Sequence, residues 1–383
     1  MSAQATMSLN WRERWFTQRD RLLTSPRFQQ AASRFVGTRP IARKRARGLF
    51  DLVAGFVYSQ LLLACVQLRL FDRLAQAPMT AAELAQEGQM PLLSAERLLE
   101  AASALDLVQA RGAQEDGQQR YGLGPLGAAM VGNTAVAAMI EHHHALYADL
   151  ADPLALLRSE RGGGALSRYW AYAESSEPGA LPGQAVAPYS ALMSASQPLI
   201  AGQVLDAYAI GRHRCLLDLG GGEGVFVANA LARAPRLKAM VFDLPAVADS
   251  ARRHLAQQGL GDRAQAFGGD FLRDALPAGA DVVSLVRVIY DHDDEPALAI
   301  LRAARSALPV GGTLLLAEPM AGAAGAEPMG AAYFGMYLMA MGSGRSRTSA
   351  ELTVLLQQAG FDQVRQRATA LPLQAGLLVA RAA

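Results

Sequence analysis

The sequence predicts an α/β fold, in which a doubly wound, Rossmann-like domain follows a smaller helical domain of the winged-helix type. Two observations predict the larger domain. After Gly211, short apolar runs alternate with helical segments, a pattern typical of a mostly parallel sheet with helices on both faces. One of these runs ends in a glycine-rich turn within LLDLGGGEG, at residues 216–224. Three helices followed by a hairpin, at residues 50–127, predict the smaller domain.

Composition narrows the classes of protein to which the chain can belong. Its 383 residues suffice for two domains, and its 51% apolar and 18% charged residues exclude a largely disordered chain. Cys65 and Cys215 are the two cysteines, which excludes a disulfide framework and a zinc ribbon and fits a reducing cytoplasm. The N-terminus, MSAQATMSLNWRERWF, lacks the apolar core of a secretory signal. We therefore expect a cytoplasmic protein.

The chain divides into four segments. They are a basic N-terminal arm at 1–49, a winged-helix-like domain at 50–130, a helical linker contributing to an acceptor pocket at 131–200, and the α/β domain at 201–383. The first 50 residues hold eleven Arg and Lys residues against two acids, Glu13 and Asp20. Such an excess can attract a nucleic acid or an anionic membrane surface, and it can also belong to a solvated tail.

A long apolar helix opens the winged-helix-like domain and ends near Ala75. Its uncharged part, residues 52–68, is 17 residues long and includes Ser59, Gln60 and Gln67. This length falls short of the ~20 apolar residues that a membrane-spanning helix needs. We therefore expect a buried helix.

The other elements of this domain are marked by their ends. Thr80 and Glu83 have the spacing of a capping box at the start of the second helix. Ser94 is the expected N-cap of the third helix. The dipeptide Asp116-Gly117 marks the turn of the hairpin.

The glycine-rich turn predicts a cofactor site at the carboxyl end of a strand. Gly220, Gly221, Gly222 and Gly224 allow a tight turn and a close approach of a ligand to the backbone. Asp218 lies two residues before the first glycine. A carboxylate there suits a cationic amino acid or a sulfonium group, whereas it would repel the pyrophosphate of NAD, the competing ligand.

Acidic residues also follow the next two predicted strands. Asp243 ends the strand AMVFD, where it can accept hydrogen bonds from ribose hydroxyls. Asp270 and Phe271 follow a third strand, where the carboxylate can accept from an adenine amino group and the ring can pack on the base. Three acids at successive strand ends predict a nucleoside ligand without phosphates. S-adenosylmethionine meets this description.

At these motifs the chain resembles the class I S-adenosylmethionine-dependent O-methyltransferases of the acetylserotonin and plant small-molecule type. The matching segments are LLDLGGGEG, VFDLP, GGDF, YDHDDE, GGTLLLAE and GRSRTSAELTVLLQQAGF, together with the front domain. More narrowly, EHHHALYADLADPLALLR, RVIYDHDDEPALAILRAARSALP and YFGMYLMAMGSGRSRT are similar to the bacterial hydroxyneurosporene and demethylspheroidene O-methyltransferases. Bacteriochlorophyll C-20 methyltransferase is similar to a lesser degree.

The resemblance implies methylation of the hydroxyl of an acyclic hydroxycarotenoid, in spheroidene or spirilloxanthin biosynthesis, by a homodimer that forms through the front domain. Met193 falls where the family places a Met near the cofactor, although a Met there can also belong to the core. The family's cofactor roles fall on Asp218 and Gly220–Gly224 for the methionine part, Asp243 for the ribose, and Asp270 with Phe271 for the adenine.

The proton acceptor departs from the plant pattern, in which a His before an Asp-Trp pair is the base. Tyr290 occupies the position of that His, and His292 that of the Trp. Ser346 replaces a second plant acid, whereas Glu318 is retained at a strand end. Three catalytic residues are therefore expected: Tyr290 as a hydrogen-bond partner, His292 as a base of suitable pKa, and Glu318 as a carboxylate facing the cleft. His292 can instead be a capping or surface residue, and Glu318 a structural carboxylate.

No metal site is expected. The three consecutive His residues at 142–144 lack the spacing of metal ligands, although one of them, His143, can face the acceptor. The acidic run at 291–295 suits the N-terminus of a helix, where carboxylates interact favourably with the helix dipole.

The acceptor pocket is expected along a Met-rich helix, because this helix lines the pocket in the family. Its residues would be Tyr333, Met336, Tyr337 and Met339, together with His143. The basic arm would then hold the enzyme at the inner or photosynthetic membrane, where carotenoids dissolve, as a peripheral protein.

Three alternatives remain at this point. The acceptor can be a bacteriochlorophyllide or another hydrophobic metabolite, and the chain can be a cofactor-binding partner protein without activity. DNA binding through the winged helix is disfavoured, because its third helix carries Arg97 against three acids and would repel phosphates.

Overall fold

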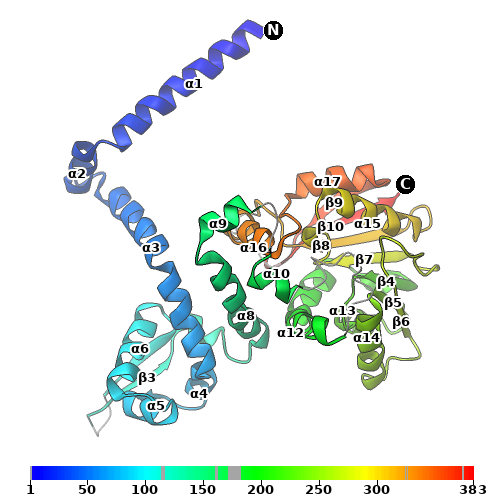
Figure 1. Cartoon of the computed structure of the whole chain (residues 1–383), viewed down its shortest axis with the longest axis horizontal. Coiled ribbons are helices and arrows are strands. Elements are labelled where there is room, and N and C mark those ends of the chain that lie inside the picture. Colours follow the sequence, from blue (N-terminus) through cyan, green and yellow to red (C-terminus); the bar gives the residue numbers. More distant parts are fainter. Residues whose placement is uncertain are drawn as a thin grey trace. The chain divides into compact units, whose positions relative to one another are not determined.

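The computed structural model describes residues 2–113, 117–159, 163–170, 183–323, 325, 327–372 and 375–383. The chain forms two compact units, Met1–Val131 and Gly132–Ala383 (Figure 1). Each unit is described by itself below.

Three helices begin the first unit: α1 (Ser2–Leu23), α2 (Pro26–Arg34) and α3 (Arg39–Gln67). The side chain of Ser25 caps α2 by accepting a hydrogen bond from the backbone N–H of Phe28, and Pro26 occupies the first turn. Helix α3 is continuous from the arm into the winged-helix-like domain, so the expected boundary at residue 49 falls inside it.

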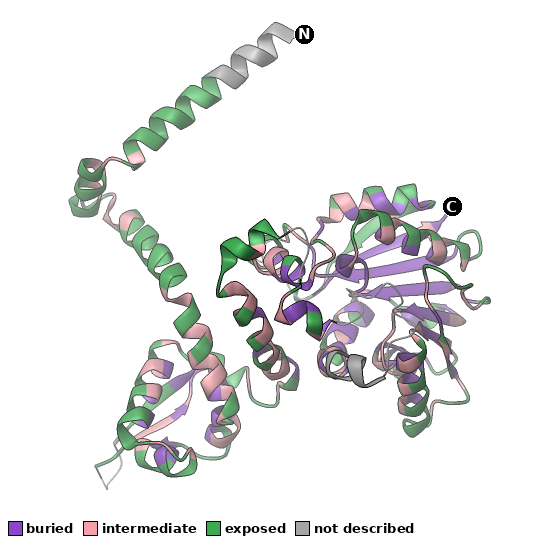
Figure 2. Ribbon diagram, viewed as in Figure 1, coloured by how far each residue is buried: buried purple, intermediate pink, exposed green. Residues whose placement is uncertain are grey.

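The prediction of a buried helix over residues 52–68 is wrong for the single chain. Cys65 is the one side chain of α3 that is buried, whereas Leu52, Val53 and Phe56 are exposed (Figure 2). The described residues of this unit cover one end of the helix and leave its apolar face open. By length and composition α3 could cross a membrane.

The rest of the first unit has the order of a winged helix. Its elements are α4 (Leu70–Gln76), β1 (Met79–Thr80), α5 (Ala81–Glu87), α6 (Leu92–Ala104), β2 (Val108–Ala113), β3 (Gln119–Leu123) and α7 (Pro125–Ala128). The strands form an antiparallel sheet in the order β1-β3-β2. The apolar faces of α4, α5 and α6 share one small core, which includes Leu70, Leu84 and Leu99.

The predicted helix signals of this unit have mixed outcomes. The capping box of Thr80 and Glu83 is confirmed, because each side chain accepts from the backbone N–H of the other residue. Ser94 is not an N-cap. Helix α6 begins earlier, at Leu92 after Pro91, and Ser94 lies in its first turn. Of the predicted turn, Asp116 lies outside the described residues.

The second unit begins with helices and continues into a seven-stranded sheet. The helices are α8 (Thr134–Leu150), α9 (Pro153–Arg158), α10 (Ala165–Tyr169) and α12 (Gly183–Ala207). The strands are β4 (Cys215–Leu219), β5 (Lys238–Asp243), β6 (Ala264–Gly268), β7 (Val282–Val286), β8 (Thr313–Glu318), β9 (Phe361–Arg367) and β10 (Gly376–Ala382). They lie in the order β6-β5-β4-β7-β8-β10-β9, and β10 is antiparallel to both of its neighbours.

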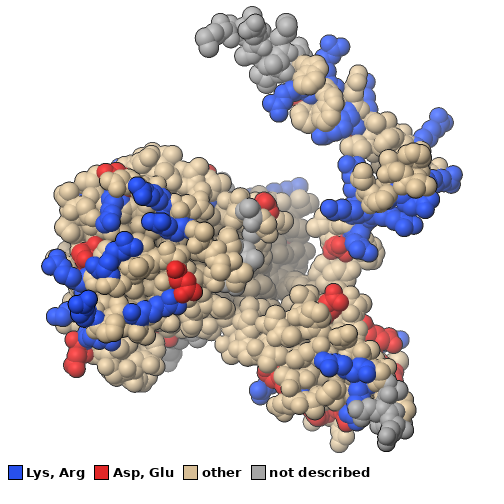
Figure 3. Space-filling model, turned by 180° about the vertical axis from the view of Figure 1, so that it is seen from behind, with Lys and Arg blue, Asp and Glu red and all other residues tan. Residues whose placement is uncertain are grey.

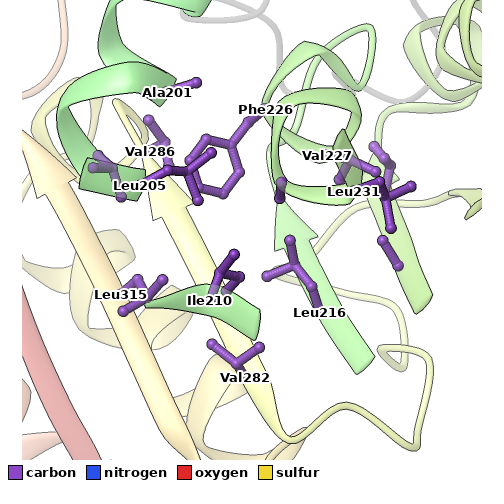
Figure 4. Close-up of a cluster of buried hydrophobic side chains, with 14 of the residues drawn as sticks. Ala201, Leu205, Ile210, Leu216, Phe226, Val227, Leu231, Val282, Val286 and Leu315 are labelled. Carbon is purple, nitrogen blue, oxygen red and sulfur yellow. The ribbon is translucent and has the colours of Figure 1, made fainter. Parts of the chain in front are cut away.

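Helices cover both faces of this sheet, which confirms the predicted doubly wound class. They are α13 (Val225–Arg233), α14 (Pro245–Gln257), α15 (Asp294–Ser306) and α17 (Ser349–Gln358). Alternate residues of each strand enter opposite cores. Leu216 belongs to the core that includes Leu205 and Phe226 of α12 and α13 (Figure 4), whereas Leu217 belongs to the core that includes Ile300 of α15.

The strand order places a crevice at one edge of the sheet. From β4 the chain adds β5 and β6 on one side and then returns to add β7 on the other side of β4. The carboxyl ends of β4 and β7 therefore form a topological switch point, where ligands of open α/β sheets bind.

Candidate functional site

A cavity of about 450 Å³ opens at this switch point. It lies entirely within the second unit. Its walls come from α12, from the turn after β4, and from the ends of β5, β6 and β7. Of the residues predicted from the sequence, the wall includes Met193, Gly220, Gly221, Gly222, Asp243, Asp270, Phe271 and His292.

The glycine-rich turn has the geometry that requires glycine. Gly220, Gly222 and Gly224 have φ values of 65°, 58° and 78°, in the left-handed region that side chains disfavour. A Cβ atom at Gly221 would lie 2.6 Å from Oδ2 of Asp218. The turn therefore brings bare backbone against both the cavity and the carboxylate beneath it. Gly224 begins α13 and is not on the wall.

Asp218 lies beneath the turn and off the cavity wall. Its side chain is buried, and its Oδ1 accepts a hydrogen bond from the hydroxyl of Ser284. Its Oδ2 has no hydrogen-bond partner among the described residues. Burial raises the pKa of Asp218 to about 7, and the nearby charge of Asp243 contributes to this shift. A cationic ligand on the other side of Gly221 would favour the ionised form.

Asp243 stands on the wall at the end of β5. Its Oδ2 accepts from the N–H of Gly222 at 2.8 Å, and its Oδ1 accepts from the N–H of Leu244 at 2.7 Å. Burial raises its pKa to about 6. Each oxygen of a carboxylate has a second lone pair, so Asp243 can accept from a diol while it holds the turn.

Asp270 and Phe271 form the wall after β6. Oδ1 of Asp270 accepts from the N–H of Leu272 at 2.9 Å, and Oδ2 lies 3.7 Å from Nε of Arg273. The ring of Phe271 meets that of His292 edge to face, with centroids 5.9 Å apart.

Arg287 also lines the cavity, and the sequence reasoning missed it. It follows β7 directly and has a φ of 60°, which is unusual for a residue with a side chain. Its guanidinium donates to the hydroxyl of Ser196 at 2.7 Å, to the carbonyl of Met193 at 3.1 Å, and to the side chain of Gln197. Arg287 thereby fixes α12, and with it Met193, against the end of the sheet. A basic residue directly after a buried strand was the signal available in the sequence.

The residues present fit S-adenosylmethionine. Asp218, Asp243 and Asp270 place negative charge around a cavity that also has bare backbone and an aromatic ring. Such a site suits an adenosyl group with a positively charged chain and disfavours phosphates. Asp218 in particular has a buried carboxylate oxygen that no described residue satisfies.

Of the three expected catalytic residues, His292 alone borders the cavity. It lies between η3 (Ile289–Asp291) and α15, and it is half-buried. Burial, reinforced by the charge of Arg347, lowers the pKa of His292 to about 4. This pKa lies below the suitable value expected from the sequence, so His292 is a weaker base than predicted. The imidazole is neutral at neutral pH, and one ring nitrogen can accept a proton.

Tyr290 is buried and points elsewhere. It belongs to an aromatic cluster, and its ring meets that of Phe334 edge to face at 5.9 Å. It is not on the cavity wall, so a direct hydrogen bond to an acceptor would need rearrangement.

Glu318 was expected to face the cleft, but it is not on the cavity wall. It is buried at the end of β8, where its Oε1 accepts from the N–H of Val288 at 3.1 Å and of Ile289 at 2.7 Å. Burial, with repulsion from Asp291, raises its pKa to about 8. Strand ends place carboxylates near a cleft, but the backbone of residues 288–289 lies between this one and the cavity.

Arg347 holds the same segment from its other side, and the sequence reasoning gave it no role. Its fully buried guanidinium donates to the carbonyl of Ile289 at 3.0 Å and of His292 at 2.7 Å, and to Oδ1 of Asp294 at 2.9 Å. The segment between Val288 and Asp294 is thus fixed by a carboxylate on its N–H groups and a guanidinium on its carbonyls.

The acidic run at 291–295 divides between two roles. Asp294 and Glu295 lie in the first turn of α15 and Asp293 at its N-cap position, which confirms the interpretation as a helix N-terminus. Oδ1 of Asp293 nevertheless accepts from Gly344 rather than from α15. Asp291 differs from the others, because it is buried and on the cavity wall.

None of the five residues predicted for the acceptor pocket is on the wall of this cavity. His143, Tyr333, Met336, Tyr337 and Met339 lie on α8, on the π-helical turn η4 (Met329–Tyr333) and on α16 (Phe334–Met341). Met336 is half-buried and Met339 is exposed. A Met-rich wall was expected at these helices. The residues found there are instead polar aromatic side chains that are hydrogen-bonded in pairs.

These pairs form a chain of hydrogen bonds with a defined direction. Nδ1 of His142 lies 2.7 Å from the carbonyl of Met139 and must donate to it, so Nε2 accepts from the hydroxyl of Tyr337 at 2.8 Å. That hydroxyl accepts from Nε1 of Trp170 at 2.9 Å. Nε2 of His143 pairs separately with the hydroxyl of Tyr333 at 2.6 Å, and burial lowers the pKa of His143 to about 4. The three helices α8, α10 and α16 are joined in this way.

The described residues contain no group of three or more His, Cys, Asp or Glu side chains that could hold a metal ion.

Comparison with known proteins relates both units to one family. Residues 148–362 match the sequence model of an O-methyltransferase domain, and residues 50–133 match that of an O-methyltransferase dimerisation domain. Demethylspheroidene O-methyltransferase of Cereibacter sphaeroides is 41% identical over 90% of this chain and 89% of its own length. Demethylspheroidene O-methyltransferase of Rhodobacter capsulatus is 35% identical over 92% of this chain and 86% of its own length. The structure of human N-acetylserotonin methyltransferase in complex with SAM superposes with a TM-score of 0.73, at 23% identity over 88% of this chain and 97% of that one.

Proposed function

We propose that this chain, which belongs to the family of S-adenosylmethionine-dependent O-methyltransferases, methylates the hydroxyl of an acyclic hydroxycarotenoid. The observation that carries the proposal is the 41% identity with a demethylspheroidene O-methyltransferase over nearly the full length of both chains. The reaction would belong to carotenoid biosynthesis.

The cofactor of the family supplies an electrophilic methyl group on a sulfonium. Asp243 and Asp270 would accept hydrogen bonds from its adenosyl part, because both carboxylates border the cavity. Met193 and Arg287 would fix the opposite wall, since the arginine ties the helix of Met193 to the sheet. Phe271 would exclude water from the adenine ring.

His292 would receive the proton that the acceptor hydroxyl loses as its oxygen is methylated. It is neutral at neutral pH and borders the cavity. Because an aliphatic alcohol is barely acidic, this transfer would come late, and alignment of the acceptor would supply most of the rate. Glu318 and Arg347 would act through His292 as positioning residues, since both bind its segment of backbone.

The dimerisation domain at residues 50–133 supports a homodimer. A second copy would cover the apolar face of α3 at Leu52, Val53 and Phe56. We further propose that the enzyme works in the cytoplasm as a peripheral protein of the membrane that dissolves its acceptor.

A transfer assay with radiolabelled S-adenosylmethionine tests the substrate class. The acceptors are a 1-hydroxylated acyclic carotenoid, a bacteriochlorophyllide and a simple catechol, each dispersed in the same detergent. Label in the carotenoid alone is the expected result. Label in the chlorin or the catechol alone would overturn the assignment of the acceptor while leaving the enzyme family in place.

A further inference from the structure

The basic arm, residues 1–49, precedes both matched family domains, so the family fold gives it no role. It is helical nearly throughout, and most of its described side chains are exposed (Figure 2). Figure 3 shows many Lys and Arg side chains along the arm, with uncharged side chains between them. A segment with this charge and so many exposed apolar side chains needs a partner.

Helix α1 gathers three apolar side chains on one narrow face, which Gln18 shares, whereas Phe16 and Leu23 lie outside it. Trp11, Trp15 and Leu22 fall within about 40° of one another, on one face. They are 69%, 54% and 51% exposed. The two acids of the arm, Glu13 and Asp20, fall on the opposite face.

Four arginines lie between these faces. Arg12 and Arg19 flank the apolar face on one side, and Arg14 and Arg21 flank it on the other. The guanidinium of Arg19 lies over the rings of Phe16 and Trp15, 4.7 and 5.5 Å from their centroids, and it also donates to Oδ1 of Asp20. A helix with an apolar face, flanking cations and acids on the far side matches the interfacial helices that lie in the plane of a bilayer surface.

The following helices continue both features. Phe35 and Val36, between α2 and α3, are strongly exposed. Five basic residues then occupy the start of α3: Arg39, Arg43, Lys44, Arg45 and Arg47.

We propose that the arm binds the surface of an anionic lipid bilayer, with Trp11, Trp15 and Leu22 of α1 in the interface and the flanking arginines on lipid headgroups. This inference rests on the proposed function, because a carotenoid acceptor would be dissolved in that bilayer. A duplex nucleic acid would neutralise the arginines and leave the two Trp rings in water, because its bases are already stacked on one another. A second copy of the arm would bring like charges together.

Flotation of the full-length chain with lipid vesicles tests the proposal. Vesicles of phosphatidylglycerol and phosphatidylcholine should carry the protein upward at low salt, and vesicles of phosphatidylcholine alone should not. Replacing the apolar face, by Trp11→Ala, Trp15→Ala and Leu22→Ala together, should weaken vesicle binding at least about tenfold. Replacing the four arginines of α1 by Gln should do the same and should reduce the dependence on salt, although the basic residues of α2 and α3 remain. The variant with Leu92→Ala and Leu93→Ala, which truncates two exposed apolar side chains outside the arm, is the control and should bind as the unaltered chain does.

Three results would overturn the proposal. They are equal flotation with neutral vesicles, unchanged binding of the Trp and Leu variant, and vesicle-bound protein that alkaline carbonate cannot extract, which would mean that α3 spans the bilayer. Trp fluorescence gives a second readout, since Trp11 and Trp15 should shift to the blue on binding while the buried Trp170 does not.

Activity separates this inference from the proposed function. In detergent, the arm variants should methylate the hydroxycarotenoid at the rate of the unaltered chain, which also shows that they fold. On acceptor dissolved in anionic vesicles, they should be slower in proportion to their loss of binding. A chain that methylates the acceptor but never floats refutes the membrane inference alone. A chain that floats but methylates no carotenoid refutes the proposed function alone.

Discussion

The two halves of the catalytic unit differ in how they are built. The cofactor half consists of strand ends and the turns that follow them, with Asp218, Asp243 and Asp270 at three successive ends. The half in which we expect the acceptor, called the acceptor half below, consists of helices α8, α10 and α16, which are joined through polar aromatic side chains such as His142 and Tyr337. Sheet topology fixes the position of a strand end, whereas each contact between helices depends on which faces meet. Changes in the two halves should therefore separate binding of the cofactor from stability and from use of the acceptor.

The largest expected effect is in the cofactor half. Asp243→Ala removes two charge-assisted hydrogen bonds, to Gly222 and Leu244, and one carboxylate of the wall. We expect affinity for S-adenosylmethionine to fall about 100-fold in titration calorimetry. Tyr337→Phe, in the acceptor half, is the matched control and should change this affinity less than about twofold. Equal losses in the two variants would show that the halves are not separate.

His292 lies where the halves meet, and its replacement should affect the rate. His292→Ala should lower kcat about 30-fold, because a positioned base contributes up to a few orders of magnitude and an alcohol can also lose its proton to water. Affinity for S-adenosylmethionine should stay within about threefold. The pH profile should be measured with saturating S-adenosylmethionine, so that protonation of Asp218 and Asp243, with pKa values of about 7 and 6, does not limit its binding. Because the pKa of His292 is about 4, activity of the unaltered enzyme should then be level from about pH 6 to 8 and fall below about pH 5, as the imidazole is protonated. A rate that is unchanged by the replacement would remove His292 as the acceptor of the proton.

A smaller effect is expected from the hydrogen-bond chain of the acceptor half. Tyr337→Phe keeps the ring and removes the hydroxyl that Trp170 and His142 share. We expect a loss of about 1–2 kcal/mol in the free energy of unfolding, measured by urea denaturation, and a higher KM for the acceptor. Tyr121→Phe, in the first unit, serves as the control, because it removes a tyrosine hydroxyl that does not belong to these hydrogen bonds. An unchanged free energy of unfolding for Tyr337→Phe would mean that these hydrogen bonds orient the side chains without stabilising the fold.

The last prediction concerns Glu318 and depends on pH. Its folded pKa of about 8 lies above that of an unfolded Glu, so the folded state binds the proton more tightly and loses stability as pH rises from about 4.5 through 8. Glu318→Gln cannot ionise but can still accept from Val288 and Ile289. Its melting temperature should exceed that of the unaltered chain by a few degrees at pH 9, and the difference should shrink at pH 6. A difference independent of pH would show that Glu318 is already ionised in the folded protein.

The sequence predicted the cofactor half because its signals are local. A glycine-rich turn, an acid two residues before it and acids after two further strands each follow from strand ends that topology brings together. Asp218 is a partial exception, since its burial beneath Gly221 depends on the φ values of the turn. The sequence could place it at the site and could not place it on or off the wall.

The helical parts were less predictable, for a physical reason. An apolar or Met-rich helix shows that one face is buried, but it does not show what covers that face. Residues 52–68 were expected in the core, but Leu52, Val53 and Phe56 are exposed in the single chain, and Met339 was expected in a pocket and is exposed. Arg347 was missed because its partners are mostly backbone carbonyls, which leave no pattern in the sequence. Arg287 was missed because two of its partners are side chains of α12, about 90 residues away in the sequence.

The product formed from a 1-hydroxylated acyclic carotenoid and S-adenosylmethionine with a ¹³C-labelled methyl group tests the central claim most directly. NMR of that product should show the label as a methyl ether at the former hydroxyl, formed by the unaltered chain and about 30-fold more slowly by His292→Ala. Label on a carbon atom, or no labelled carotenoid under conditions in which the cofactor binds, would contradict the account.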